Sequence, residues 1–446
     1  MNDLDGLTRE ELVALVLEQQ VVILALQEEI NGLRSKPGSG SAMKTAPEWV
    51  KANRPPREKK ERKKRHKSFV RRRESATKIV QHALKCCPDC GRRLSGGAVR
   101  RVRQVIEIPV APVRIVEHRI IRRYCGVCRK VQTPRVDLSQ EVVGTHRVGV
   151  RLMSLVAYMN IVGRMTKRTI QSFLKAIYGL HLGLGEISKI LHTVAKLGKK
   201  DKEKLLEAVR GSPYINADET VWREDGKNGY VWTFSSKDVR YFVFRRSRSG
   251  AVAREAIGEE YAGTIVTDCY GGYNGVLADR QVCWAHLARD LHSLAEEHPK
   301  NEDVARCAKA VMEVYQRAKG FSSKSAKRRR WERVLLEEEM HRLTEPYLES
   351  DDAQRVLAQR LEKHLCELFV FVEDPEVPSD NNGAERALRP VVITRKVCGG
   401  SRSERGSETK MTLMSLFGTW KVRGLDVLEA CRLLLTGYSV LFPQTS

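Results

Sequence analysis

The sequence predicts a multidomain α+β protein, and three observations support this fold class. Residues 7–35 repeat apolar side chains at the spacing of a coiled-coil helix, and two Cys-x-x-Cys pairs mark a small module. From about residue 211, short runs rich in Val, Ile, Tyr, Phe and Trp predict strands, and residues 287–370 then have a mostly helical pattern. A chain of 446 residues is long enough for one large core with smaller modules attached.

Charge is the clearest compositional signal. The chain has 79 Lys and Arg against 55 Asp and Glu, a formal net charge of +24. Each phosphate that Lys or Arg neutralises releases condensed counterions, so this excess favours a nucleic acid partner. Residues 51–73 hold thirteen Lys or Arg and two Glu, which predicts a basic arm that cannot bury apolar surface. The alternative for this run is a solvated or nuclear-localisation-like stretch.

The N-terminal sequence and the cysteine usage lead us to expect a cytosolic protein with no membrane partner. MNDLDGLTREE is acidic and polar, whereas a secretion signal begins basic and continues apolar. The longest apolar runs, such as VVILAL at 21–26, are too short to cross a bilayer. Eleven cysteines, four of them in two close pairs, favour metal over disulfides in such a chain.

Residues 1–36 are expected to form a coiled coil that makes the protein a homo-oligomer. The apolar seam alternates at spacings of four and three, and its one polar member, Gln19, lowers stability but can fix the register. The alternative is a single amphipathic helix packed on the body. KPGSGS at 36–41 ends the helix, and the basic linker or arm extends over 37–79. The seam consists of Leu12, Val16, Gln19, Ile23, Leu26, Ile30 and Leu33.

The cysteine pairs predict structural zinc in a zinc-ribbon-like module at residues 80–138. Thirty-four residues separate the pairs, and VRQVIEIPV and VRIVEHRII within that gap alternate apolar and polar residues as hairpin strands do. Four thiolates in two knuckles suit a closed tetrahedral site. Coincidental spacing and a redox pair are the alternatives, and Cys86 is a rival of Cys87. The module's arginines suggest contacts to DNA phosphates. The expected zinc ligands are Cys87, Cys90, Cys125 and Cys128.

Residues 139–205 are expected to be helical. Two sets of apolar residues follow the spacing i, i+3, i+4, i+7 on either side of the glycine-rich GLHLGLG. Two short amphipathic helices around a tight turn are compatible with a DNA-binding helix-turn-helix and equally with ordinary core helices. The sets are Ile170, Phe173, Leu174 and Ile177, then Ile187, Ile190, Leu191 and Val194.

The strand-rich region predicts an α/β core formed by residues 206–299 and 371–446. Three strands (YINADET, YVWTFSS, RYFVFRR), a helix (SGAVAREAIGEE) and a further strand (GTIVTDCY) follow one another, and RQVCWAHL reads as another strand. This is the opening order of a ribonuclease H-like fold, although many α/β domains share pieces of it. Residues 300–370 are expected to be a helical insertion with a basic break, KSAKRRRW, at 324–331. Two helices are expected at 407–421 and 425–437.

Acidic residues at strand ends are candidate ligands of divalent metal. Asp218 ends the run YINAD and Asp268 ends TIVTD, and neighbouring strands of a ribonuclease H-like sheet would bring both to one metal pair. Glu219 is a rival ligand, and the alternative for Asp268 is an Asx turn into YGGY. Glu385 follows a capping segment, SDNN, near a helix start; its alternative is an i, i+4 pair with Arg389.

Four strings resemble those of insertion-sequence-66 family transposases. They are ADET at 217–220, TDCYGGY at 267–273, CWAHLARDL at 283–291 and NNGAERALRPVVITRK at 381–396. The resemblance extends over roughly residues 80–440. It implies a ribonuclease H-like core interrupted by a helical insertion, with a catalytic triad at Asp218, Asp268 and Glu385.

The resemblance also implies an activity. It is a DDE-type transposase reaction, with metal-dependent cleavage at the element's ends and then attack of the freed 3′-hydroxyl on target DNA. We expect two magnesium ions, with manganese as a substitute, and a bacterial, nucleoid-associated protein whose partners are transposon ends, target DNA and accessory transposition proteins. The basic residues around Glu385 are expected to grip DNA phosphates; they are Arg386, Arg389, Arg395 and Lys396.

Two other classes of function compete with the transposase. One is a non-catalytic zinc-containing DNA-binding regulator, and the other is a ribonuclease H-like nuclease without joining activity. Trp331 is a candidate for stacking on an unpaired base or for buried packing. His286 is a candidate neighbour of the site in the strand next to that of Asp268, but a packed or hydrogen-bonded histidine is the favoured interpretation. The cysteines without metal spacing are expected to be small core residues: Cys269, Cys283, Cys307, Cys366, Cys398 and Cys431.

Overall fold

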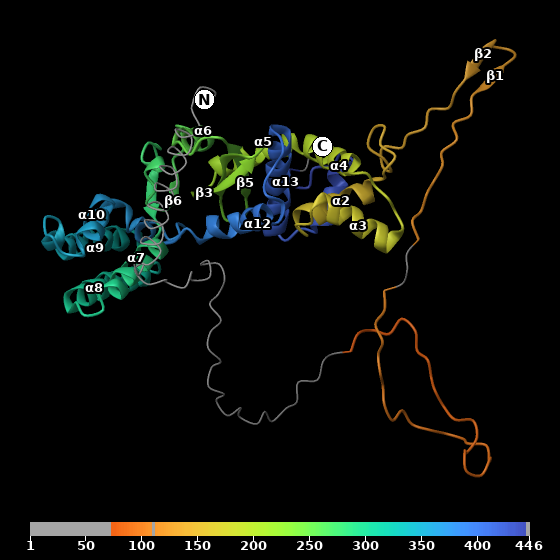
Figure 1. Ribbon diagram of the computed structural model, residues 1–446, viewed down its shortest axis with the longest axis horizontal. Coiled ribbons are helices and arrows are strands. Elements are labelled where there is room, and N and C mark those ends of the chain that lie inside the picture. Colours follow the sequence, from red (N-terminus) through yellow and green to blue (C-terminus); the bar gives the residue numbers. More distant parts are fainter. Residues whose placement is uncertain (1–72, 109–111, 443–446) are drawn as a thin grey trace, which may run out of the picture. The chain divides into compact units, whose positions relative to one another are not determined.

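The computed structural model describes residues 73–108 and 112–442 and divides the chain into two units, Met1–Glu107 and Ile108–Ser446 (Figure 1). Each unit is described by itself. The predicted coiled coil at 1–36 and residues 37–72 of the predicted basic linker or arm lie outside the described residues.

Each cysteine pair lies in a tight turn of its own unit. In the first unit, the Cys87 amide donates to the Arg92 carbonyl at 2.8 Å and the Gly91 amide donates to the Cys87 carbonyl at 2.9 Å. In the second unit, strands β1 (Arg123–Cys125) and β2 (Lys130–Gln132) form an antiparallel hairpin. The other pair lies at its turn, with Cys125 at the end of β1 and Cys128 between the two strands.

The hairpin expected from VRQVIEIPV and VRIVEHRII is wrong. Their described residues, 102–108 and 113–121, contain no strand. Apolar side chains of both segments are exposed, for example 79% for Val105 and 88% for Ile115. Alternation predicts a strand only where one face is buried against a core, and these segments have no such core within their units.

A five-stranded mixed sheet forms the centre of the second unit, in the order β5-β4-β3-β6-β7. The first three strands are antiparallel, and β6 and β7 run parallel to β3. Asp225 and Gly226 close the β3–β4 hairpin with φ of 52° and 73°, the left-handed conformation that a two-residue Asp-Gly turn requires. The strands are β3 (Tyr214–Glu224), β4 (Lys227–Ser235), β5 (Arg240–Arg245), β6 (Thr264–Thr267) and β7 (Asp279–Val282).

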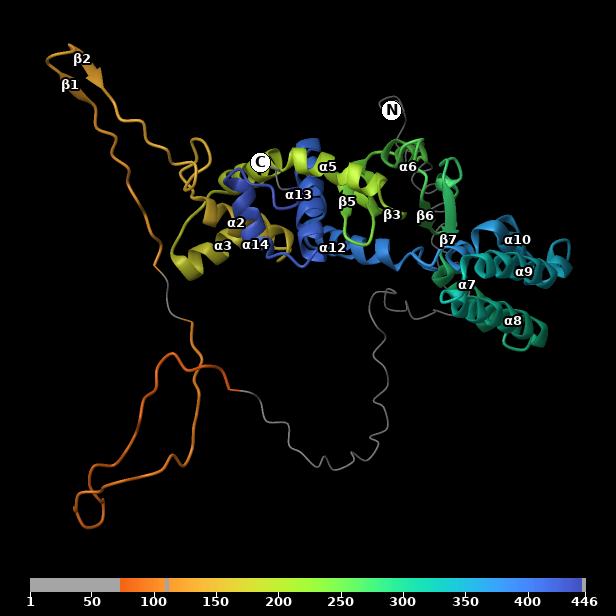
Figure 2. The same cartoon turned by 180° about the vertical axis from the view of Figure 1, so that it is seen from behind.

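Two hydrophobic cores use this sheet, and the alternation of β6 separates them. Ile265 packs into a core shared with α2–α5, α13 and α14, whereas Val266 packs into a second core built by α7–α11. Figures 1 and 2 show α8, α9 and α10 on one side of the sheet and α2, α3 and α4 on the other.

The helices of the first group are α2 (Val150–Ile161), α3 (Lys167–Tyr178), α4 (Leu184–Leu197), α5 (Lys199–Arg210), α13 (Glu404–Val422) and α14 (Val427–Leu435). Those of the second group are α7 (Trp284–Glu297), α8 (Glu302–Ala318), α9 (Ala326–Thr344), α10 (Arg355–Lys363) and α11 (Val370–Glu373). Helix α6 (Ala251–Ile257) links β5 to β6, and α12 (Asn382–Cys398) packs on β3 and β4.

Most expected elements are confirmed, and the errors have simple causes. RQVCWAHL changes at Cys283 from strand β7 into helix α7, because its period changes from two to that of a helix. KSAKRRRW is no break, since Ser325 caps α9 and the basic residues form its first turns. In α3, Phe173 and Ile177 are exposed although Ile170 and Leu174 are buried.

Candidate active site

The sheet brings Asp218 and Asp268 to the same level of adjacent strands. The β3–β6 register ends at the pair of Asn216 and Val266; Asp218 lies two residues further along β3, and Asp268 directly follows Thr267, the last residue of β6. Parallel neighbours lie about 4.8 Å apart, so the two backbones are close at this point. Asp218 does not end its strand as expected, since β3 continues to Glu224 and stays paired with β4 over that length. Only the pairing of β3 with β6 ends in this part of the strand, at Asn216.

The other acidic side chains of the candidate site act on the pKa of Asp218. Burial raises the pKa of Asp218 to about 8, together with repulsion from Glu219, Asp268 and Glu385. A 2.8 Å hydrogen bond from the Glu219 amide to Asp218 Oδ1 opposes this shift. Asp218 therefore experiences the charges of both other carboxylates predicted from the sequence.

Glu219 is engaged by other groups. Its carboxylate accepts a hydrogen bond from Tyr273 Oη at 2.8 Å and one from Arg248 Nε at 2.8 Å. The side chain is 3% exposed. Burial raises its pKa, and the Tyr273 and Arg248 hydrogen bonds oppose that rise. With its oxygens bound in this way, Glu219 is a weaker metal-ligand candidate than Asp218.

Asp268 is held in the Asx turn that was its alternative interpretation. Its Oδ1 accepts the Tyr270 amide at 3.0 Å, and its backbone carbonyl accepts Arg280 Nη2 at 2.6 Å. Arg280 is 6% exposed and also donates to Thr267 Oγ1. The turn uses Asp268 Oδ1 and fixes the direction of the carboxylate, so this turn and a ligand role for Oδ2 are compatible.

Helix α12 presents Glu385 in its first turn, and Asn381 attaches that turn to β3. The Asn381 side chain donates to the Ala217 carbonyl at 2.7 Å and accepts Asn216 Nδ2 at 3.0 Å. The Asn381 carbonyl accepts the Glu385 amide at 3.2 Å. A Cβ at Gly383 would lie 2.3 Å from Asn216 Oδ1, so only glycine permits this approach. Asn381 thus joins the backbones that carry Asp218 and Glu385.

Glu385 faces basic groups from α7 rather than Arg389. His286 Nε2 lies 3.8 Å and Arg289 Nη2 lies 3.7 Å from Glu385 Oε1. His286 is on helix α7 and not in a strand, which corrects its expected position, but it does lie beside the candidate site. Its Nδ1 is buried without a hydrogen-bond partner in the described structure.

The donor set suits hard divalent cations, which prefer carboxylate oxygens. Among residues 73–108 and 112–442, no group of three or more His, Cys, Asp or Glu side chains is drawn close enough to hold a metal ion.

Comparison with known proteins identifies the family. The model of the family described as "Transposase IS66 family" matches residues 145–409, which is more than half of the chain.

The chain belongs to this family.

Curated relatives from Sinorhizobium fredii have no assigned function. "Uncharacterized protein y4qI" is 26% identical over 275 residues, covering 54% of this chain and 50% of the relative. "Uncharacterized protein y4jO" is 29% identical over 169 residues, covering 36% and 49%. "Uncharacterized protein y4jD" is 25% identical over 287 residues, covering 57% and 56%. The chain therefore spans about half the length of the curated relatives it matches.

The four predicted DNA-binding residues lie on two different faces of α12. Arg386, Arg389 and Lys396 are exposed. Arg395 is partly buried and donates to the Thr220 hydroxyl and the Val221 carbonyl of β3. At 100° per residue the first three share one face and Arg395 lies on the opposite face. Arg395 therefore anchors the helix to the sheet.

Within each cysteine pair, backbone amides point at the first sulfur. The Cys128 amide donates to Cys125 Sγ at 3.4 Å, and backbone hydrogen bonds from Cys128 and Val127 lower the pKa of Cys125. Backbone hydrogen bonds from Asp89 and Cys90 lower the pKa of Cys87 in the same way. The two pairs belong to different units, so their joint zinc site stays a prediction.

Several other expectations have clear outcomes. Cys283 and Cys431 are buried as expected, but Cys366 and Cys398 are exposed. Trp331 is 53% exposed with the Arg328 guanidinium 4.7 Å from its ring centroid, which excludes buried packing. No helix in the described part of the chain is long and apolar enough to cross a membrane.

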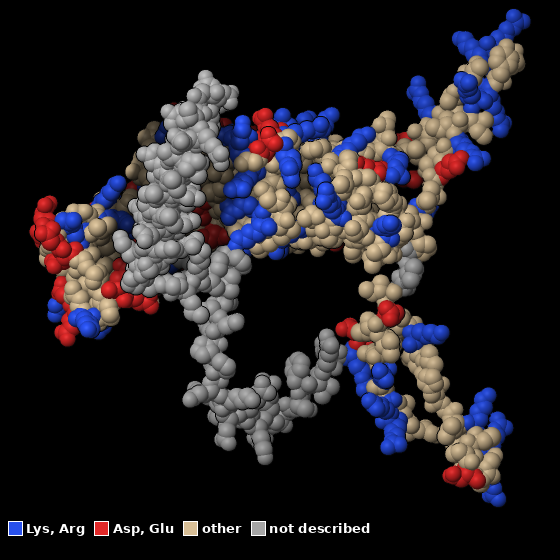
Figure 3. All heavy atoms as spheres, in the orientation of Figure 1, with Lys and Arg blue, Asp and Glu red and all other residues tan. Residues whose placement is uncertain are grey.

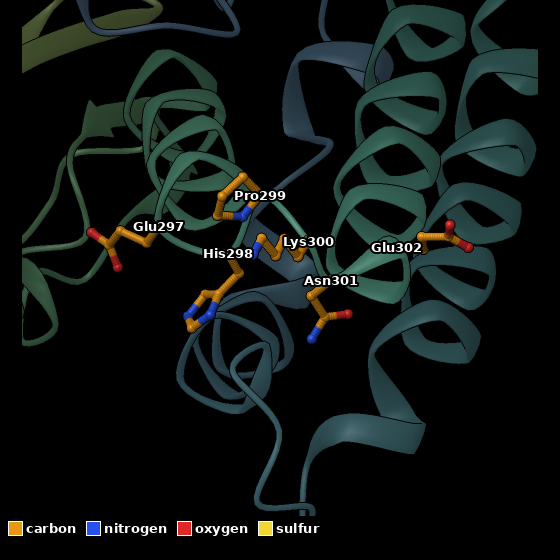
Figure 4. Close-up of a pocket in the computed structure, with 6 residues that line it drawn as sticks. All are labelled: Glu297, His298, Pro299, Lys300, Asn301 and Glu302. Atoms are coloured by element: carbon orange, nitrogen blue, oxygen red, sulfur yellow. The ribbon is translucent and has the colours of Figure 1, made fainter.

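A shallow hollow at the α7–α8 link is not part of the candidate site. It is lined by residues 297–302, and Figure 4 shows Glu297 and Glu302 pointing away from each other at its two ends. None of the three carboxylates lines it.

Sequence reasoning missed the residues that fix these carboxylates. Asn216 and Arg280 are buried and hydrogen bonded within strands β3 and β7, which carry several other polar residues. The sequence therefore did not single them out, and it did not identify Asn381 as the partner of Asn216.

Proposed function

We propose that this protein is a DNA transposase that cleaves the ends of its element and transfers the 3′-hydroxyl strand into target DNA. The observation that carries the proposal is the placement of Asp218 on β3, of Asp268 directly after the adjacent strand β6, and of Glu385 in the first turn of α12, which Asn381 attaches to β3. The charges of Asp268 and Glu385 also help to raise the pKa of Asp218. Membership of the transposase family supports it independently. The strand order β5-β4-β3-β6-β7, with an antiparallel half and a parallel half, further supports a ribonuclease H-like core.

In this proposal the three carboxylates hold two divalent cations, magnesium or manganese. Bound cations would polarise the scissile phosphate and stabilise the negative charge on the attacking and leaving oxygens. Asn381 and Arg280 hold the backbones of Glu385 and Asp268 in place, so the carboxylates are oriented before DNA arrives. Arg386 and Arg389, exposed beside Glu385, bind DNA phosphates near the cut.

The test is cleavage and strand transfer by single variants with the carboxylate removed. We expect Asp218→Asn, Asp268→Asn and Glu385→Gln each to reduce magnesium-dependent cleavage by at least about 1000-fold, because each removes a charge that holds the metal. Binding of uncut DNA, measured with a chelator present, should be retained. Glu302→Gln on α8 is the matched control and should cleave normally.

Normal cleavage by any of the three variants removes that residue from the site. Cleavage without joining of a precut 3′-end supports a nuclease, and DNA binding without cleavage by the unaltered protein supports a regulator.

We also propose that Cys87, Cys90, Cys125 and Cys128 bind structural zinc. The inward-pointing amides of each pair support this, since they favour thiolates. Elemental analysis should find about one zinc per chain, lost in a Cys90→Ser, Cys128→Ser double variant. A zinc-free protein that folds normally would contradict the proposal.

A further inference from the structure

A second group of like charges lies near the C-terminal end of α12, contributed by α3, α4 and α13. Lys167 Nζ donates to Ser188 Oγ at 2.7 Å, and Lys410 Nζ donates to Asn160 Oδ1 at 2.7 Å. Nearby, His192 Nδ1 and Thr409 Oγ1 are hydrogen bonded at 2.7 Å. We call Lys167 and Lys410 the lysine pair.

The partners of the lysine pair are neutral. Each ammonium has three N–H donors, and the hydrogen bonds just given use one donor of each lysine. No ion pair found in residues 73–108 and 112–442 includes either lysine. The fold therefore keeps two cations close together without a carboxylate to neutralise them.

The charge of Lys167 acts on Lys410. Burial lowers the pKa of Lys410 to about 8; Cys398 opposes this shift, and the charge of Lys167 adds to it. Partial loss of hydration lowers the pKa of Lys167, although its side chain is largely exposed, and Cys398 again opposes the shift. Cys398 is the last residue of α12, which locates the lysine pair at that end of the helix. A buried amine without a counter-charge destabilises the fold unless a ligand supplies an anion.

Exposed basic residues connect this end of α12 to the candidate active site. Arg386, Arg389 and Lys396 follow one face of the helix from Glu385 toward Cys398. Thirteen residues of helix span about 20 Å, the length of about six base-pair steps. Figure 3 shows Lys and Arg side chains over the region of α13 and the sheet, while Asp and Glu gather mainly around α8–α10.

We propose that Lys167 and Lys410 form a binding site for the phosphodiester backbone of DNA, one helix length from the candidate active site. A phosphate oxygen supplies the anion that the fold does not provide and accepts the unused N–H donors. The inference rests on the proposed function in that DNA is the ligand, but it does not depend on catalysis.

The experiment measures binding of a labelled DNA duplex by anisotropy, with a chelator present, across about 50 to 200 mM salt. Lys167→Met and Lys410→Met should each weaken binding about three- to tenfold and reduce the magnitude of the log K against log salt slope by about 0.9. Lys363→Met, an exposed lysine on α10, is the control and should change neither.

Thermal stability separates a binding role from a structural one. If Lys410 is there for DNA, methionine of similar size removes a desolvated charge, so Tm should stay level or rise. If Lys410 instead stabilises the C-terminal end of α12, its loss should lower Tm. Lys167 is exposed, so its variant folds regardless. An unchanged salt slope for Lys167→Met, or a lowered Tm for Lys410→Met, overturns the proposal. Absence of cleavage by the unaltered protein would contradict the proposed function. It would not change the dependence of DNA binding on salt, by which the lysine pair is tested.

Discussion

The two ends of α12 present opposite electrostatic environments built on the same principle. At the N-terminal end, burial and neighbouring carboxylates raise the pKa of Asp218 to about 8. At the C-terminal end, burial and a neighbouring ammonium lower the pKa of Lys410 to about 8. Each end therefore favours loss of its own charge unless a counter-ion arrives, a cation at one end and an anion at the other.

Another buried charge in the same unit shows that this fold can neutralise its charges. Glu224 is 4% exposed and accepts hydrogen bonds from Arg246 and the Ser407 hydroxyl. The groups that neutralise Glu224 come from the protein itself. The difference supports the two proposals, in which a cation binds at one end of α12 and a phosphate at the other.

Among variants that keep all three carboxylates, the largest expected effect tests how firmly Glu385 is held relative to Asp218. Asn381→Ala removes the bonds to Ala217 and Asn216, so Glu385 can shift relative to Asp218. A displacement of about 1 Å should slow cleavage about 100-fold. The magnesium concentration for half-maximal cleavage should rise, while DNA binding in chelator stays unchanged.

Asn301→Ala is the control, because it removes the side-chain cap of α8. It should lower Tm without moving the magnesium midpoint. If Asn381→Ala likewise lowers Tm and leaves the magnesium midpoint unchanged, Asn381 is a structural residue and not a positioning residue.

A smaller effect tests whether the two ends of α12 change stability with pH in opposite directions. The folded pKa of Asp218, about 8, lies above its ordinary value of 3.8, so the unfolded chain loses this proton first as pH rises. Its contribution to stability is therefore present at low pH and is lost as pH approaches 8. In metal-free protein, Asp218→Asn should raise Tm by about 2–4 °C near pH 8 and hardly at all near pH 4.

Lys410→Met should show the opposite pH dependence. The folded pKa of Lys410, about 8, lies below the ordinary 10.5, so its destabilising effect is complete below pH 8 and fades as pH rises toward 10.5. The gain in Tm should be greatest below pH 8. Calorimetric scans across pH check both variants, and the same pH trend for the two would contradict the comparison.

The candidate site was predictable to different depths. Asp218 and Asp268 follow apolar strands, so a local pattern pointed to them, although β3 continues past Asp218. Glu385 had no such signal and depended on the resemblance of the Asn-Asn-Gly-Ala-Glu-Arg string. The hairpin expected between the cysteine pairs failed because alternation specifies a strand only where a core receives one face.

The sequence by itself determined the order of strands and helices, the basic character of the chain and its family motifs, because periodicity, charge and short strings are local properties. Only the tertiary structure decided which of these residues meet. Asn381 reaches β3 across 164 residues of chain, and Lys410 meets Asn160 across 250. Arg395 turned inward while Arg389 stayed exposed, since α12 has one face on the sheet. Contacts between distant segments depend on how the whole core packs, and no local pattern contains that information.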